Sequence, residues 1–352
     1  MSSQRAVGSA MSAQVRAGAA LALSGRYAFG GRDAARGLQA WAEHAGVRLT
    51  IVDATSDDAR TAGAVRDLVG RHDLVFGPYG SGPMRAVQHE LAGSPWVIWN
   101  HGAAAARPSP IRQLDVLAPA ERYWFGLPDV LSERGIDLAR VVLLVAPSHF
   151  SRRVAAGACD ALAAHGTTPL WVGELRPEGV ADAVGDAVRR GAQAIIGCGR
   201  REDDLALAGA LRGTPLVVGL VLCGIAEAAN DLGAALVGWI GPTQWAPDGP
   251  QPVFGLPTGA EYPAAQAAAA GLVAHAALAV AGSANPDDLW AAGLSLRMTT
   301  HLGQFDVDAD GQQLGVHPSL VSWVAGPVGP VRRTIWSPAA PGHASLDHGP
   351  DA

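Results

Sequence analysis

The residues with the clearest chemical potential form a glycine-rich turn, Gly77-Pro-Tyr-Gly-Ser-Gly82, directly after the apolar run 74–76. Glycines let backbone amides approach a bound anion, and the N-terminus of the helix expected next favours negative charge. The spacing differs from G-x-G-x-x-G, and no acidic residue follows where a ribose would need one, which disfavours a dinucleotide site. Carboxylate or small-anion binding and a plain tight turn both fit the pattern.

A second polar turn, Asn100-His101-Gly102-Ala103, follows the next apolar run, 96–99. In an open α/β sheet, ligands bind beyond the carboxyl ends of the strands. Two neighbouring strand ends with small and polar residues can therefore converge on one carboxylate. His101 alone decides little, because such a histidine is as often structural or solvent-facing.

An acidic stretch, Asp306, Asp308 and Asp310-Gly311, matches the first half of a calcium-binding loop. The twelfth position is His317, where such a loop needs a bidentate glutamate. A turn built from Asp and Gly explains the same residues. We therefore expect no metal site here.

The cysteines are Cys159, Cys198 and Cys223, and none forms C-x-x-C. Their small-residue and aliphatic surroundings predict buried thiols. Cys198 stands between two glycines at a strand end, where an exposed nucleophile could sit, but the sequence places no histidine or acid beside it. No G-x-S-x-G motif exists either. We expect a protein without catalytic residues or cofactor, and keep a hydrolase using Cys198 or His101 as an alternative.

All 26 basic residues are arginine. The absence of lysine excludes a P-loop and Schiff-base chemistry, both of which need its amine. A net charge of −6 argues against a nucleic-acid surface. The composition, 49% hydrophobic and 16% charged, predicts large buried cores.

These candidate residues sit within a repeating alternation of strands and helices. Strands are predicted at 15–23, 47–52, 74–76, 96–99, 141–145, 169–172, 194–196 and 215–218. Helices are predicted at 30–45, 57–69, 84–91, 151–165, 179–190 and 203–211. Repeated βα units with buried strands predict parallel sheets with helices on both faces. Two such runs, divided near 125–128, predict two doubly wound lobes.

The last third of the chain changes character. A Pro/Gly-rich loop is expected at 242–263, followed by an alanine-rich helix, a helix at 287–296 and short strands at 305–311, 320–324 and 331–336. The apolar run at 262–280 contains His275 and predicts a buried helix instead of a membrane span. Residues 338–352 are expected to form a disordered tail.

The region around 17–23 is a short apolar run that leads into a turn, which predicts a strand and no signal peptide. We therefore expect a cytoplasmic location. The alternative is a periplasmic or cell-surface protein whose sequence is given in its trimmed mature form.

Three pieces together resemble the type I periplasmic binding proteins of the branched-chain amino acid and amide group, which serve ABC transporters. The pieces are Leu23–Gly30 with Arg36-Gly-Leu38, then Phe76–Gly82, and lastly Phe305–Leu314 with Ser322-Trp323. The resemblance covers about residues 15–336. It implies two lobes joined by three crossovers, with a hinge that closes on a ligand in the cleft.

The resemblance also implies the ligand-binding residues. Ser81 would donate its hydroxyl to a carboxylate, Phe150 would stack from the second lobe, and the Leu222-Cys223 turn would close the pocket. The full expected set is Tyr27, Tyr79, Gly80, Ser81, Asn100, His101, Gly102, Ala103, His149, Phe150, Leu222, Cys223 and Trp245.

One departure from the family concerns the ligand's ammonium. Amino acid binders of this group usually place a second-lobe carboxylate on it, but the stretch Gly219–Gly224 contains no acid. A buried ammonium without a partner is costly. An aromatic or aliphatic acid, or an amide, therefore fits better than an α-amino acid.

We predict lobes of 15–125 with 246–313 and of 126–245 with 314–337. The expected function is non-catalytic binding of a small organic carboxylate or amide as the substrate-binding component of an ABC transporter, with its permease as partner. A cytoplasmic ligand sensor that controls a partner protein is the alternative. Neither nucleic acid nor direct membrane insertion is expected.

Overall fold

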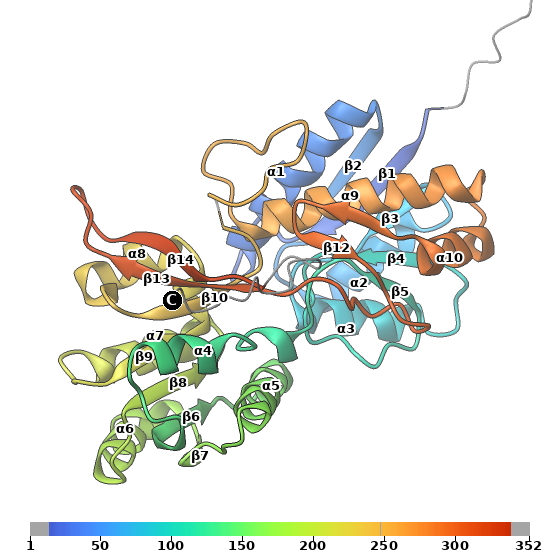
Figure 1. Cartoon of the computed structure of the whole chain (residues 1–352). Helices are drawn as coiled ribbons and strands as arrows, with labels where there is room; N and C mark the ends of the chain where they lie inside the picture. Colours follow the sequence, from blue (N-terminus) through green and yellow to red (C-terminus); the bar gives the residue numbers. More distant parts are fainter. Residues whose placement is uncertain (1–13, 247, 339–352) are drawn as a thin grey trace, which may run out of the picture.

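In the first lobe, five short strands form a parallel sheet in the order β2-β1-β3-β4-β5. The computed structural model describes residues 14–246 and 248–338 and shows two lobes (Figure 1). The strands are β1 (Arg16–Leu21), β2 (Arg48–Asp53), β3 (Leu74–Phe76), β4 (Val97–Asn100) and β5 (Arg112–Asp115).

Helices cover both faces of this sheet. One face packs against α1 (Ala28–Ala45), α9 (Tyr262–Ala281) and α10 (Pro286–Ser295), and the other against α2 (Asp58–Leu68) and α3 (Ser81–Glu90). A small hairpin, β11 (Met298–Thr300) with β12 (Gly303–Phe305), follows α10. Each face therefore has its own apolar core.

The second lobe is built on a seven-stranded sheet in the order β14-β13-β10-β9-β8-β6-β7. Its parallel strands are β6 (Val141–Val145), β7 (Trp171–Glu174), β8 (Ala194–Cys198), β9 (Val217–Leu220) and β10 (Ile240–Thr243). Strand β14 (Val331–Trp336) forms one edge, and β13 (Ser319–Val324) lies between it and β10; β13 pairs antiparallel with both neighbours. The predicted two-lobed, doubly wound class is confirmed, with this antiparallel edge as an addition.

The helices of the second lobe again divide between two cores. Helices α4 (Leu127–Glu133) and α5 (His149–Ala164) lie on one face, and α6 (Val180–Arg189), α7 (Arg201–Leu211) and α8 (Glu227–Leu232) on the other. Strands β1–β5 belong to the first sheet, and β6–β10 with β13 and β14 to the second. The residue boundaries of the lobes stay a prediction, and residues 339–352 of the expected tail lie outside the described residues.

Short elements account for most differences from the sequence prediction. Strand β5, helices α4 and α8, and strand β10 were not predicted. The sequence of β5, Arg-Gln-Leu-Asp, is mostly polar because Gln113 bonds Gln88 at 2.8 Å and Asp115 pairs with Arg107 at 2.8 Å. A strand whose buried residues are paired polar side chains lacks the hydrophobic pattern by which strands are predicted.

Helix α9 is the one helix of the described residues that is long and apolar enough to cross a membrane. Within its most apolar window, 61% of the residues are buried. It packs lengthwise on α1 in the first core. This is weak evidence for a membrane span, because core helices of globular proteins meet the same criteria, and it agrees with the predicted buried helix.

The chain passes between the two sheets three times: after β5, after β10 and after β12. Side-chain hydrogen bonds join these three crossings to one another. The amide of Ala118 donates to Gln244 Oε1 at 2.8 Å, and Gln244 Nε2 donates to the Ala118 carbonyl at 3.0 Å. Arg122 donates to the carbonyls of Leu314 at 2.6 Å and Val316 at 3.1 Å. The first crossing is therefore joined to the second by Gln244 and to the third by Arg122.

A close approach of α1 and α9 gives a stability test. A Cβ on Gly37 would lie 2.0 Å from the Ala264 carbonyl oxygen, whereas a Cβ on Gly209 of α7 would meet nothing within 4 Å. We expect Gly37→Ala to lower the free energy of unfolding by about 1–3 kcal/mol through overpacking. Gly209→Ala should raise it by about 0.5–1 kcal/mol, because alanine favours helix.

Denaturant titration followed by circular dichroism measures both changes. Equal effects of the two substitutions would contradict the close α1–α9 contact.

Candidate functional site

The turns after β3 and β4 lie side by side. Gly80 has a φ of 107°, a conformation that favours glycine, and its amide donates to the Gly102 carbonyl at 2.9 Å. A Cβ on Gly102 would lie 2.7 Å from the Cα of Tyr79, so this contact also requires a glycine. The two strand ends therefore lie together as expected, while the binding of a carboxylate there stays a prediction.

Ser81 is the first residue of α3, at this junction. Its Oγ accepts a hydrogen bond from the Ala105 amide at 3.0 Å, which leaves the hydroxyl hydrogen for another acceptor. The amides of Ser81 and Gly82 belong to the first turn of the helix, where the helix supplies no acceptor. These donors and the helix dipole together suit a carboxylate.

Asn100 stabilises the turn after β4 through hydrogen bonds of its side chain. Its side chain is fully buried and donates to the Ala103 carbonyl at 3.0 Å and to Asp115 at 2.7 Å. Its Oδ1 accepts from the amides of Gly102 at 3.3 Å and Ala103 at 3.0 Å. These four bonds use the whole capacity of the side chain, so the structure gives Asn100 a role in shaping the turn. The Ala103 amide is likewise engaged.

His101 is fully buried behind the same turn. Burial lowers the pKa of His101 to about 4, partly opposed by the Gly77 backbone. Neither ring nitrogen makes a hydrogen bond of ordinary geometry to any described residue. The imidazole is therefore neutral at pH 7 and sealed from solvent.

Three tyrosines from distant parts of the chain, Tyr79, Tyr123 and Tyr262, lie close to one another. The hydroxyls of Tyr79 and Tyr262 are 2.6 Å apart, and Gln244 donates to the Tyr123 hydroxyl at 3.2 Å. The rings of Tyr123 and Phe150 meet edge to face, with 5.6 Å between centroids. Burial raises the pKa of Tyr79 to about 12 and also raises the pKa of Tyr123, so these phenols stay neutral.

Tyr27 stands at the N-terminal end of α1, and its amide donates to Ser56 Oγ at 3.0 Å. Burial raises the pKa of Tyr27; in the second lobe the charge of Glu202 adds slightly to this shift and that of Arg200 opposes it. The Arg26 guanidinium lies 4.6 Å above the ring. Tyr27 therefore lies within electrostatic reach of the second lobe.

The second lobe contributes the turn η4 (Val221–Gly224), which contains the predicted residues Leu222 and Cys223. Both are buried, and the Leu222 amide donates to Asp204 Oδ2 at 2.8 Å. Burial raises the pKa of Asp204 to about 8, although the backbone bond from Leu222 opposes the shift. A buried carboxyl group thus supports η4.

The remaining predicted residues lie in different surroundings. His149 begins α5 and is half-buried, close to Phe150. Trp245 belongs to the first-lobe core and donates its indole N–H to the Pro250 carbonyl at 2.8 Å. Cys198 is fully buried, and burial raises the pKa of its thiol well above the usual value.

Sequence reasoning missed a second-lobe acid near Tyr79. Glu227 begins α8, three residues beyond the searched stretch that ends at Gly224, and its charge acts on Tyr79. Glu227 lies 3.8 Å from Arg201. Extending the search through the first turn of the next helix would have found it.

The acidic stretch near 306–311 forms a turn. The Asp308 carboxylate accepts from the amides of Asp310 at 3.0 Å and Gln312 at 2.8 Å. Asp306 pairs with Arg297 at 2.8 Å. The described residues contain no group of three or more side chains that could hold a metal ion.

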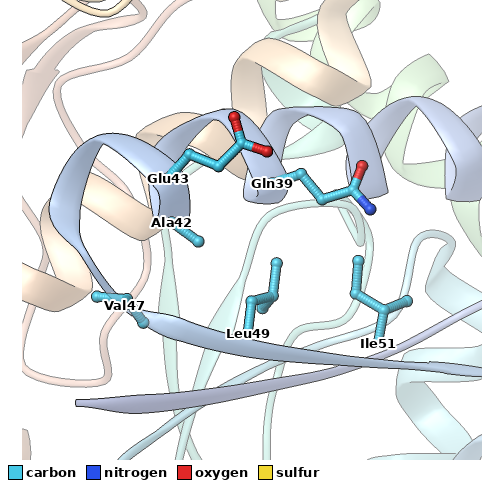
Figure 2. Close-up of a pocket in the computed structure, with 6 residues that line it drawn as sticks. All are labelled: Gln39, Ala42, Glu43, Val47, Leu49 and Ile51. Atoms are coloured by element: carbon cyan, nitrogen blue, oxygen red, sulfur yellow. The ribbon is translucent and has the colours of Figure 1, made fainter. Parts of the chain in front are cut away.

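Two surface hollows lie away from the predicted ligand residues. Figure 2 shows one between α1 and the edge strand β2, with Leu49 and Ile51 facing Gln39 and Glu43. The other lies beneath β14 and α8, lined by Trp323 and Arg332 among others. None of the predicted ligand residues lines either hollow.

The fold matches solved structures of ABC-transporter binding proteins. The leucine-binding protein of Thermotoga maritima is 14% identical, with a TM-score of 0.75, covering 92% of this chain and 99% of its own. A solute-binding protein from R. palustris, in complex with 4-hydroxybenzoate, is 14% identical, with a TM-score of 0.75 and coverage of 92% and 96%. A type 1 periplasmic binding protein from Bordetella pertussis is 15% identical, with a TM-score of 0.74 and coverage of 92% and 100%.

The chain therefore has the type I periplasmic-binding-protein fold, as the sequence resemblance predicted. No protein-family profile matches the sequence, and no curated protein is detectably similar.

The expected cytoplasmic location is wrong. The similar structures include substrate-binding proteins of ABC transporters, and the one from Bordetella pertussis is described as periplasmic. The short apolar run that we interpreted as a first strand is indeed β1, but this does not decide the compartment.

The buried carboxyl of Asp204 predicts a pH-dependent stability. Its folded pKa of about 8 lies well above the usual value of 3.8 for an aspartate, so folding favours the protonated form. The stability that this provides is present at low pH and is lost as the pH rises from about 4 to 8. We expect Asp204→Asn to raise the free energy of unfolding by about 1–3 kcal/mol at pH 8 and by little at pH 4.

Urea titrations at pH 4, 6 and 8 measure this difference. Asp160→Asn, at an exposed site on α5, is the control and should change stability little at any of these pH values. A stability gain for Asp204→Asn that is independent of pH would contradict the assignment.

Proposed function

We propose that this protein binds a small organic acid between its lobes and delivers it to the permease of an ABC transporter outside the cytoplasm. The observation that carries the proposal is the junction of the turns after β3 and β4. There the Ser81 hydroxyl is oriented by the Ala105 amide, beside the first-turn amides of α3. Such a group of donors suits one carboxylate.

The aromatic walls support an acid with an aromatic or branched apolar body. Tyr27, Tyr79 and Tyr262 come from the first lobe, Tyr123 from the first crossing and Phe150 from the second lobe. Flat rings of this kind bury large apolar area while their hydroxyls bond polar substituents. The complex of the R. palustris protein with 4-hydroxybenzoate supports the same ligand class.

The acids nearest the tyrosines, Glu227 of the second lobe and Glu261 of the first, favour a ligand without an ammonium group. Glu227 already lies near Arg201, and Glu261 is paired with Arg332. A ligand ammonium would have to compete with these arginines for its counter-charge.

Non-enzymatic binding is supported by the state of the candidate nucleophile and base. Cys198 and His101 are both fully buried, the first with a raised pKa and the second with a lowered one. A reactive thiol needs an exposed, electropositive surrounding. Among the similar structures, none of those described supports the sensor alternative.

Calorimetric titration tests the ligand class. The probes are benzoate, 4-hydroxybenzoate, 4-methylpentanoate and leucine. We expect the carboxylates without an amino group to bind more tightly than leucine and to be recovered unchanged. Tighter binding of leucine would contradict this ligand class and would assign Glu227 to the ammonium. Conversion of a probe would contradict the binding function.

Ser81→Ala tests the carboxylate contact with the tightest probe of this set. Loss of a charge-assisted hydrogen bond should weaken binding by about 1.5–3 kcal/mol. Ser132→Ala, at an exposed position of α4, is the matched control and should bind as the wild type does. Unchanged affinity of Ser81→Ala would remove this residue from the site.

A further inference from the structure

Arg332 joins segments of both lobes through one guanidinium group. It lies on β14, donates from Nη1 to the Gly224 carbonyl at 2.6 Å, and pairs through Nη2 with the Glu261 carboxylate. The side chains of Arg332 and Glu261 are only 10% and 9% exposed. The ion pair is therefore largely protected from solvent.

The first acceptor, Gly224, ends the turn η4 that carries Leu222 and Cys223. The carbonyl of Cys223 accepts a hydrogen bond from the Trp323 indole at 2.9 Å. The guanidinium of Arg332 also lies 5.8 Å from the Trp323 ring. Strands β13 and β14 therefore hold the end of η4 by two adjacent carbonyls.

The second acceptor, Glu261, directly precedes Tyr262 at the start of α9. Its amide donates to Asp33 Oδ2 on α1 at 3.0 Å, which anchors it to the first lobe. The next residue, Tyr262, makes the 2.6 Å contact with the Tyr79 hydroxyl. A displacement of Glu261 would therefore move a tyrosine of the cleft wall.

We propose that Arg332 is a positioning residue for ligand binding, which sets the distance between η4 in the second lobe and the start of α9 in the first. This inference rests on the proposed function of the cleft. Arg332 acts through Gly224 and Glu261 without contacting the ligand. Only a planar group with divergent N–H donors satisfies both acceptors at once.

A substitution of Arg332 alone would lower the stability of the protein, so a loss of affinity could not be assigned to positioning. Glu261 is buried, and its Oε2 has no hydrogen-bond partner among the described residues, so the carboxylate would lose its counter-charge. Neutralising both partners avoids this, because an ion pair can often be replaced by uncharged groups of similar size without loss of stability. The informative variant is therefore the double substitution Arg332→Met/Glu261→Gln.

The experiment compares wild type, the double variant, Arg332→Lys and Arg333→Met. Lysine keeps the positive charge beside Glu261 but has no second nitrogen to donate to the Gly224 carbonyl. Arg333 is the exposed neighbour on β14 and serves as the control. The readouts are the urea midpoint, the affinity for the tightest-binding acid among benzoate, 4-hydroxybenzoate and 4-methylpentanoate, and peptide-level hydrogen exchange over 221–226 and 259–264.

We expect the double variant to keep the wild-type urea midpoint, to lose about tenfold in affinity and to exchange faster over both peptides. Arg332→Lys should show a smaller loss of affinity, and Arg333→Met should behave as the wild type. Wild-type affinity in either the double variant or Arg332→Lys would overturn the proposal. If the double variant does not fold, Arg332→Lys decides by the same criterion.

Failure of the proposed function has a separate signature. If the wild type binds none of the acids, the ligand class is wrong, and hydrogen exchange decides the role of Arg332. Faster exchange over both peptides in a folded Arg332 variant, relative to Arg333→Met, supports the positioning role. Unchanged exchange overturns it.

Discussion

The fold depends on how three chain crossings are held to one another between two lobes that each have their own apolar cores. The side-chain amide of Gln244 exchanges two hydrogen bonds with the backbone of Ala118, and Arg122 holds the carbonyls of Leu314 and Val316. Buried backbone groups in such irregular segments must find partners, and here side chains supply them. These ties are confined to the crossings, so they set the position of one lobe against the other while leaving each sheet intact.

This arrangement brings together residues that are far apart in the chain. Tyr123, beside the first crossing, meets Phe150 of the second lobe and accepts a hydrogen bond from Gln244 of the second crossing. Tyr262 begins the helix that follows the second crossing and meets Tyr79. The aromatic walls are therefore attached to the same segments that would bend, which would couple ligand contact to the lobe arrangement.

The sequence predicted those features that the residues of a single strand, helix or turn determine by themselves. The apolar run at Val141–Val145 is strand β6, and the glycine-rich turn before Ser81 does open α3. Asn100 looked like a ligand contact for the same reason, since it is polar at a strand end. Its bonds to Asp115 and to its own turn could not be foreseen, because they depend on β5, a polar strand without a hydrophobic pattern.

The long-range polar contacts could not be predicted either, because they depend on how distant segments pack together. Arg332 and Glu261 are 71 residues apart, and nothing in either local sequence distinguishes a buried pair from two exposed charges. Glu227 was missed because the search ended with η4 and did not extend into the next helix. Which charged residue faces a cleft is decided by tertiary packing and not by periodicity.

Small-angle X-ray scattering of the wild type, with and without saturating amounts of the tightest-binding acid, tests the central claim most directly. A ligand held between Ser81 in the first lobe and Phe150 in the second must draw the lobes together, so the radius of gyration should fall on binding. An unchanged radius of gyration in a sample that calorimetry shows to be saturated would contradict binding between the lobes.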